Sequence, residues 1–150
     1  MGLRVHIQAT AGARAALGDA AVPRALLRRG ARSVLRAHGV SDGELSLTLL
    51  GAAEIAALHQ QYLGHTDATD VISFALFEPP DPVLGDVYIG ASRAAAEAQA
   101  RGIPLDQELL RLTVHGTLHV LGHDHPTGTG RTRSRMWRLQ ERIITEVLAS

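Results

Sequence analysis

The stretch His115–His125, with the sequence HGTLHVLGHDH, decides how we interpret this 150-residue chain. Its histidines His115, His119 and His125 follow the spacing H-x3-H-x5-H. On a helix the first two lie on one face, about 6 Å apart along the axis. Gly122 can end that helix in a left-handed turn, because glycine has no Cβ to clash, and His125 can then return towards the other two. Three converging imidazoles predict a zinc site with its fourth position open.

Two polar residues of this stretch are candidates for other roles at the site. We interpret His123 as a neighbour of the metal or a substrate contact, and not as a ligand. Asp124 is a candidate to accept a ring N–H from a ligating histidine and so fix its tautomer. The alternative is that these histidines are ordinary polar residues at a helix end, which three at this spacing with an intervening glycine disfavour.

The residue after the first histidine argues against one class of zinc enzyme. The spacing copies the metzincin signature H-E-x-x-H-x-x-G-x-x-H, but Gly116 stands where a metalloprotease carries its glutamate general base. Without that carboxylate a zinc-activated water lacks its usual proton acceptor, so peptide hydrolysis by the familiar route is disfavoured.

The same stretch resembles the signature H-G-x-L-H-L-x-G-[YH]-D-H of the YbeY family, with Val120 in place of a leucine. YbeY proteins are bacterial single-strand endoribonucleases and rRNA maturation factors. Two more blocks, Thr69–Phe74 and Leu84–Ile89, resemble the family in the same order, so the resemblance covers roughly residues 40 to 148. It implies a zincin-like architecture, one zinc ion per chain, single-stranded RNA as substrate, and the small ribosomal subunit with a ribosomal protein as partners.

The chain departs from the family pattern before the second block. The family has Y-R-x-K-D-x-P there, and its functional arginine falls on Leu63 and its lysine on His65. Leucine cannot bind phosphate, so the arginine is either lost or replaced from elsewhere. Arg111 and the arginines between 131 and 142 are the candidates. Because the metal motif is intact, the sequence predicts metal binding more directly than nuclease activity.

Composition limits the chemistry and the location. Hydrophobic residues make up 45% of the chain, aromatic residues 3%, and there is no cysteine, so histidine and carboxylate are the strong ligands that remain. No apolar run approaches the roughly 20 residues that span a bilayer, and the first residues lack the apolar core of a signal peptide. We expect one domain over residues 1–150, in the cytoplasm and not in a membrane.

The net charge of zero hides an uneven distribution. Residues 1–38 carry +6, residues 39–110 carry −9 and residues 111–150 carry +3, and all fifteen basic residues are arginine. Arginine pairs with phosphate through two hydrogen bonds and stacks on bases. For the arginines of a helix predicted over 23–38 we favour a solvated surface. Four arginines on one side of the last predicted helix are candidates to bind the RNA backbone, with a solvated surface as the alternative: Arg131, Arg135, Arg138 and Arg142.

Hydrophobic periodicity predicts the fold class. Alternation or apolar runs predict strands over 3–9, 44–50, 71–77 and 84–89, and a loop is expected over 10–21. Helical spacing predicts helices over 23–38, 52–63, 92–101 and 131–148. Pro104 and Asp106 open the metal-bearing helix, and its core stripe is predicted at Leu110, Val114, Leu118 and Leu121. The class is α+β: a single zincin-like domain with a mixed sheet of about four strands packed with about five helices.

Hydrolysis of an RNA phosphodiester is the leading hypothesis, because zinc on the three histidines would lower the pKa of a water and polarise a phosphoryl oxygen. The strand over 84–89 is expected to form a wall of the cleft, with Asp86 and Tyr88 on one side. Candidates for the general base are Asp86, Asp70, Asp124, His123 and His65. Two alternatives stay open: a zinc hydrolase of a substrate other than RNA, and a non-catalytic ribosome assembly factor with a structural metal.

Overall fold

The computed structural model of the chain describes residues 2–63, 70–123 and 135–150. Its α+β architecture confirms the expected class, with four strands and, in these ranges, six helices where five were expected. The elements are β1 (Leu3–Ala9), α1 (Ala11–Leu17), α2 (Arg24–Ala37), β2 (Gly43–Leu50), α3 (Ala52–Leu63), β3 (Val71–Ala75), β4 (Val83–Gly90), α4 (Ala91–Arg101), α5 (Leu105–Val120) and α6 (Arg135–Ala149).

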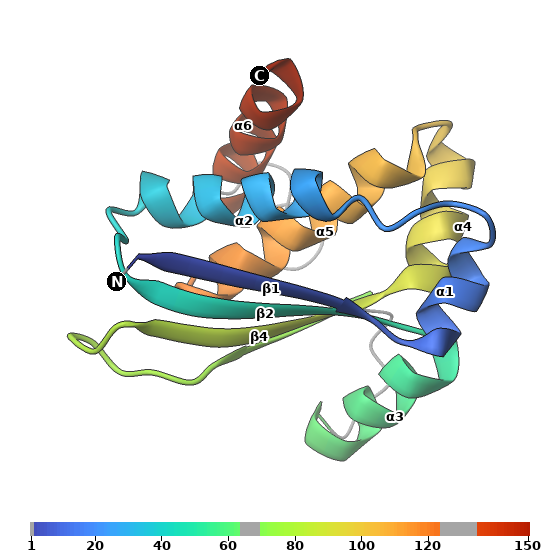
Figure 1. Cartoon of the computed structure of the whole chain (residues 1–150), viewed down its shortest axis with the longest axis horizontal. Helices are drawn as coiled ribbons and strands as arrows, with labels where there is room; N and C mark the ends of the chain where they lie inside the picture. Colours follow the sequence, from blue (N-terminus) through green and yellow to red (C-terminus); the bar gives the residue numbers. More distant parts are fainter. Residues whose placement is uncertain (1, 64–69, 124–134) are drawn as a thin grey trace.

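The strands form one mixed sheet in the order β1-β2-β4-β3. The pairs β1–β2 and β2–β4 are parallel, and β3 runs antiparallel to β4 at the edge. In Figure 1, α2 and α5 lie across one face of the sheet and α3 lies on the other. Leu45, Leu47 and Leu49 alternate along β2 and are fully buried, so the hydrophobic side of the sheet faces α2 and α5.

Two arginines of α2 cover the open edge of the sheet. Arg24 donates a hydrogen bond to the carbonyl oxygen of Ile7, and Arg28 Nε donates to that of Val5 at 3.3 Å. Edge strands expose unpaired backbone groups that favour pairing with other chains, and long charged side chains prevent this. Arg28 is half-buried here, so the solvated surface that we expected for the arginines of this helix is wrong for it, whereas Arg24 stays exposed while it binds the strand.

The loop expected over residues 10–21 contains a short helix, α1. Thr10 caps it, because its hydroxyl oxygen accepts a hydrogen bond from the Ala13 N–H at 3.1 Å. Gly18 ends it with a φ of +63°. Alanine has the highest helix propensity, and these residues are rich in alanine. The small side chains that we interpreted as a loop are therefore what allows this helix to form.

Helix α5 lies at the centre of the fold and packs against α2, α4, α6, β3 and β4. Its predicted inner stripe is confirmed for Leu110, Val114 and Leu118, which are fully buried, whereas Leu121 after the helix end is half-buried. Helix α6 packs against α5 through a buried stripe that includes Met136 and Ile143. Within the described part of the chain, no helix combines the length and the apolar character needed to cross a membrane.

Candidate metal centre

The last turns of α5 bring two of the three predicted ligands together. His115 Nε2 and His119 Nε2 lie 3.0 Å apart, and the two rings meet edge to face at 75°. His115 is buried among the surrounding helices, with 7% of its surface exposed, whereas His119 is half-buried. His115 is thus held in the protein core, and His119 is partly accessible to solvent.

The spacing of the two nitrogen atoms fits a shared metal ion. Zinc binds imidazole nitrogen at about 2.0–2.1 Å in tetrahedral geometry, which sets two ligand nitrogens about 3.3 Å apart. In the ranges 2–63, 70–123 and 135–150, no group of three histidine, cysteine or carboxylate side chains gathers to complete the set. The predicted third ligand, His125, lies outside the described residues.

The chain turns after α5 at Gly122, as predicted. Gly122 has a φ of +94°, a left-handed conformation that glycine adopts without a steric penalty. Its N–H donates to the carbonyl oxygen of His119 at 2.9 Å, and the N–H of His123 donates to that of Leu118 at 3.0 Å. These bonds end the helix directly after the second histidine and redirect the chain. Asp124 also lies outside the described residues.

His123 meets a histidine that sequence reasoning missed. Its Nε2 lies 2.7 Å from the Nε2 of His38 at the end of α2, and the His38 Nδ1 lies 2.7 Å from the carbonyl oxygen of Val34. Burial lowers the pKa of His123, as do the charges of His38 and Arg135. His38 precedes its partner by 85 residues, so no local pattern links the two.

A second missed residue lies behind the first ligand. Gln140, on the buried side of α6, is only 1% exposed and places its Oε1 2.6 Å from His115 Nδ1. Its Nε2 donates to Glu141 Oε2 at 3.1 Å, and Arg111 also donates to that oxygen. The sequence did contain one sign of this role. Gln140 follows Met136 by four residues, so it is a polar residue within the apolar stripe of this helix.

Comparisons with known proteins identify the family of this chain. The family model described as Endoribonuclease YbeY matches residues 18–148. The chain belongs to the YbeY family. The Endoribonuclease YbeY of one Thermus thermophilus strain is 40% identical over 127 residues, which are 82% of this chain and 88% of that protein. The Endoribonuclease YbeY of Geobacter sulfurreducens is 41% identical over 128 residues, covering 81% and 84%.

A solved structure supports the same fold. The solution structure of TM1509 from Thermotoga maritima superposes with a TM-score of 0.63 at 25% sequence identity, covering 97% of this chain and 89% of that one.

Asp86 lies away from the histidine pair of this YbeY-family chain. Along β4, Val87 faces α5, and a Cβ on Gly116 would lie 2.5 Å from its Cγ1. Because side chains alternate along a strand, Asp86 and Tyr88 face the opposite side of the sheet, where the Tyr88 ring contacts Phe74. Burial raises the pKa of Tyr88, and the charge of Asp86 adds to this effect. The structure therefore does not bring Asp86 together with His115 and His119.

The arginines that could replace the family arginine differ in availability. Arg111 is committed to Glu141 and lies 3.7 Å from a Glu108 carboxylate oxygen, so its guanidinium is not available to a phosphate. Arg135, Arg138 and Arg142 are exposed on α6. Arg131, His65 and the side chain of Leu63 lie outside the described residues. Asp70 is described, and its carbonyl oxygen accepts a hydrogen bond from the Gly90 N–H at 2.8 Å.

Close packing explains why glycine occupies position 116 of the YbeY signature. A Cβ there would lie 2.5 Å from Val87 Cγ1 and 3.0 Å from Val71 Cγ2. The Gly116 carbonyl oxygen also accepts a hydrogen bond from Ser73 Oγ at 2.9 Å. The helix thus lies directly on β3 and β4, and no glutamate general base fits at this position.

We expect Gly116→Ala to lower the free energy of unfolding by about 1–2 kcal/mol in urea denaturation. Overpacking costs about 1–3 kcal/mol, and we expect the upper part of this range because the new Cβ would meet two rigid β-branched side chains at 2.5 and 3.0 Å. The roughly 1 kcal/mol that alanine gains in helix propensity offsets part of this cost. Gly30→Ala in α2 is the matched control, because the one atom closer than ordinary contact to its Cβ would be the end of a leucine side chain, Leu110 Cδ1, at 2.5 Å, while Val114 Cγ2 lies at 3.4 Å. A larger loss in the control would contradict this account.

Proposed function

We propose that this chain is a zinc-dependent endoribonuclease that cleaves single-stranded RNA in rRNA processing, including 3′-end maturation of small-subunit rRNA and ribosome quality control. The observation that carries the proposal is the pair of Nε2 atoms 3.0 Å apart on α5, in a chain of the YbeY endoribonuclease family. The small ribosomal subunit and one of its proteins would be its partners, in the cytoplasm.

In this proposal His115, His119 and His125 hold one zinc ion. The ion would supply Lewis acidity towards the phosphodiester and activate a water near neutral pH. His123 and Asp124 are proposed to move protons, because they occupy the segment between the second and third ligands. Asp86 is not included, since it lies on the other face of the sheet from α5.

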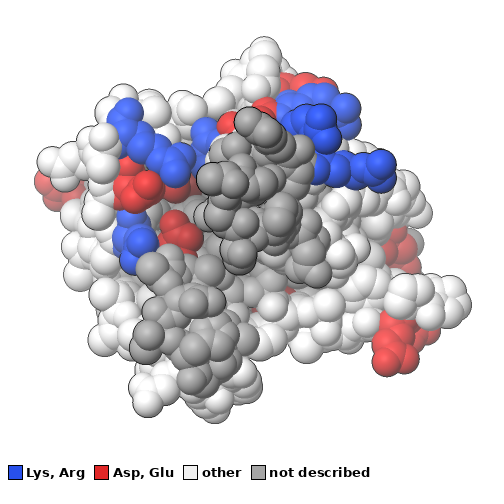
Figure 2. Space-filling view, turned by 180° about the vertical axis from the view of Figure 1, so that it is seen from behind, with Lys and Arg blue, Asp and Glu red and all other residues white. Residues whose placement is uncertain are grey.

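The exposed arginines of α6 are proposed to hold RNA. The inner side of this helix contacts His115 through Gln140, while Arg138 and Arg142 lie on its exposed side. A helix is about 10 Å across, so these arginines would bind phosphates that flank the cleaved one. Figure 2 shows the basic side chains of one face in separate groups, with acidic side chains beside them. RNA would therefore meet local arginine groups, not one uninterrupted basic surface.

We expect Arg138→Ala/Arg142→Ala to weaken binding of single-stranded RNA and to flatten its salt dependence. Each phosphate contact contributes about 0.7 to the slope of log K against log salt concentration, so two lost contacts reduce the slope by about 1.4. Fluorescence anisotropy over a salt series measures this. Arg14→Ala/Arg93→Ala removes two other exposed arginines, on α1 and α4, and should leave the slope unchanged. Equal slopes for the two double variants would disprove this assignment.

The proposed activity is tested with labelled single-stranded and duplex RNA and with protein stripped by a chelator. Cleavage should be confined to single-stranded RNA, disappear on stripping, return with zinc and be absent in His119→Ala. Cleavage that survives both treatments would refute the proposal. Zinc and RNA binding without cleavage would favour an assembly factor with a structural metal, and hydrolysis of a different substrate would favour the other alternative.

A further inference from the structure

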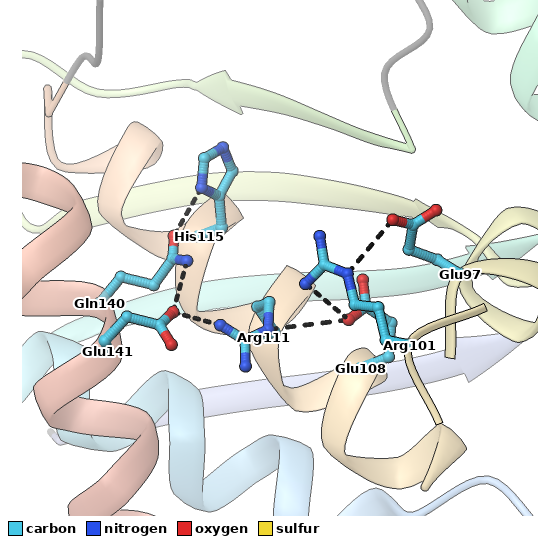
Figure 3. A network of polar contacts seen from close by, with 7 residues as sticks. All are labelled: Glu97, Arg101, Glu108, Arg111, His115, Gln140 and Glu141. Atoms are coloured by element: carbon cyan, nitrogen blue, oxygen red, sulfur yellow. Dashed lines mark hydrogen bonds and ion pairs between the residues drawn. The ribbon is translucent and has the colours of Figure 1, made fainter. Parts of the chain in front are cut away.

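We propose that Gln140 is a positioning residue that holds His115 in the Nδ1–H tautomer, so that the Nε2 lone pair is presented to the metal. The inference rests on the proposed metal site and goes beyond it, because it assigns a role to a side chain of α6. Figure 3 shows the Gln140 amide between the His115 ring and the Glu141 carboxylate.

The carboxylate of Glu141 fixes the orientation of the amide. A carboxylate only accepts hydrogen bonds, so the end of the amide that lies 3.1 Å from Glu141 Oε2 must be the NH₂ group. If the amide were turned over, its oxygen would face the carboxylate with no proton between them. The oxygen of Gln140 therefore points to His115.

The orientation of the amide decides the tautomer of the histidine. An amide oxygen carries no hydrogen, so at 2.6 Å the His115 Nδ1 must be the donor. A neutral ring with its proton on Nδ1 keeps a lone pair on Nε2, the atom that faces His119 Nε2. Histidine ligands usually donate their second ring N–H to an acceptor in this way, which fixes both tautomer and ring orientation.

The contacts behind Glu141 hold the carboxylate in place. Arg111 binds the same oxygen, Oε2, that accepts from Gln140. Beyond Arg111, Glu108 Oε1 lies 3.7 Å from Arg111 Nε and 3.9 Å from an Arg101 nitrogen, and Figure 3 shows both ion pairs. These outer contacts are longer than hydrogen bonds, and among the described residues neither Glu108 Oε1 nor Arg111 Nε has a hydrogen-bond partner. Orientation of His115 is therefore assigned to Gln140, supported by Glu141.

The test is Gln140→Met, which keeps a long unbranched side chain in the buried position and removes the acceptor. Long-range ¹H–¹⁵N spectra of the metal-free protein, recorded above about pH 7.5 where an ordinary imidazole is neutral, report the tautomer of His115. Wild type should show Nδ1–H, and Gln140→Met should shift towards Nε2–H. Zinc affinity measured against a competing chelator should fall about 10–100-fold in the variant.

Two further variants keep the test decisive. Gln140→Glu retains an acceptor, so it should keep the Nδ1–H tautomer and bind zinc much more tightly than Gln140→Met. If Gln140→Met does not fold, Gln140→Asn takes its place, because it withdraws the amide by one methylene and stays polar.

The two proposals fail separately in these measurements. An unchanged tautomer and unchanged zinc affinity in the folded variant would overturn the role of Gln140 and leave the metal site standing. If wild type shows the Nδ1–H tautomer and Gln140→Met shifts away from it, but wild type binds no zinc, the role of Gln140 would be supported and the proposed function overturned.

Discussion

His115→Ala should abolish zinc binding by the purified protein and, with it, RNA cleavage. The residue supplies one of three proposed ligands, and its Nε2 lies 3.0 Å from that of His119. Loss of a residue that only orients a ligand typically costs about 10–100-fold in metal affinity, so loss of a ligand should cost more than about 100-fold. Wild type should carry close to one zinc per chain, and elemental analysis after gel filtration should detect none in the variant.

The control is His6→Ala, which removes an exposed histidine of β1 that lies 3.3 Å from Glu44. It should retain both the zinc and the activity. Circular dichroism must show that His115→Ala is folded, since the ring is buried and its loss leaves Gln140 without one partner. A full zinc load in a folded His115→Ala protein would refute the ligand set.

The sequence predicted those parts of the fold in which one local pattern dominates. Leu110, Val114 and Leu118 lie at helical spacing and are fully buried in α5, as expected. The alternation that placed Asp86 and Tyr88 on one side of a strand is also confirmed by the Tyr88–Phe74 ring contact. Alternation with a period of two residues assigns side chains to the two faces of a strand, but it does not say which face a helix covers. The structure was needed to show that Asp86 lies on the face away from α5.

The candidate site was predictable in part for the same reason. His115 and His119 are four residues apart, and helix geometry alone brings them together. Gln140 and His38 approach the site from α6 and α2, and their positions follow from how these helices pack. The only local sign of Gln140 was its polarity at a buried position. Contacts between residues far apart in the sequence produce no local sequence pattern from which they could be predicted.

Helix α5 also carries a buried charge whose pairing matters for stability. Glu108 is 2% exposed, and its Oε1 lies 3.7 Å from Arg111 Nε and 3.9 Å from an Arg101 nitrogen. Burial raises the pKa of Glu108, the charges of the two arginines oppose this, and the charges of Asp70 and Glu97 add to it. Because the pKa in the folded state lies above its unfolded value, stability falls as the pH rises through that interval.

Arg111→Met should lower the free energy of unfolding by about 3 kcal/mol near neutral pH. Removing one partner of a buried ion pair typically costs about 3–5 kcal/mol, whereas exposed pairs contribute about 1 kcal/mol or less. We expect the lower end of the first range, because Arg101 remains 3.9 Å from Glu108 Oε1 but its side chain is 44% exposed and screened by water. Glu141, the second partner of this guanidinium, has a side chain that is 35% exposed, so water can solvate it. The expected loss of stability therefore comes mainly from the buried Glu108 carboxylate, which no longer has Arg111 beside it.

The pH dependence and a double variant identify Glu108 as the cause. Without Arg111 the pKa of Glu108 rises further, so the loss of stability should shrink as the pH is lowered and the carboxylate takes up a proton. In Glu108→Gln/Arg111→Met no buried charge is left alone, and most of the stability should return. Urea denaturation of the three proteins at several pH values measures both effects. A loss that is independent of pH and not relieved by Glu108→Gln would instead assign the role of Arg111 to packing of its aliphatic stem.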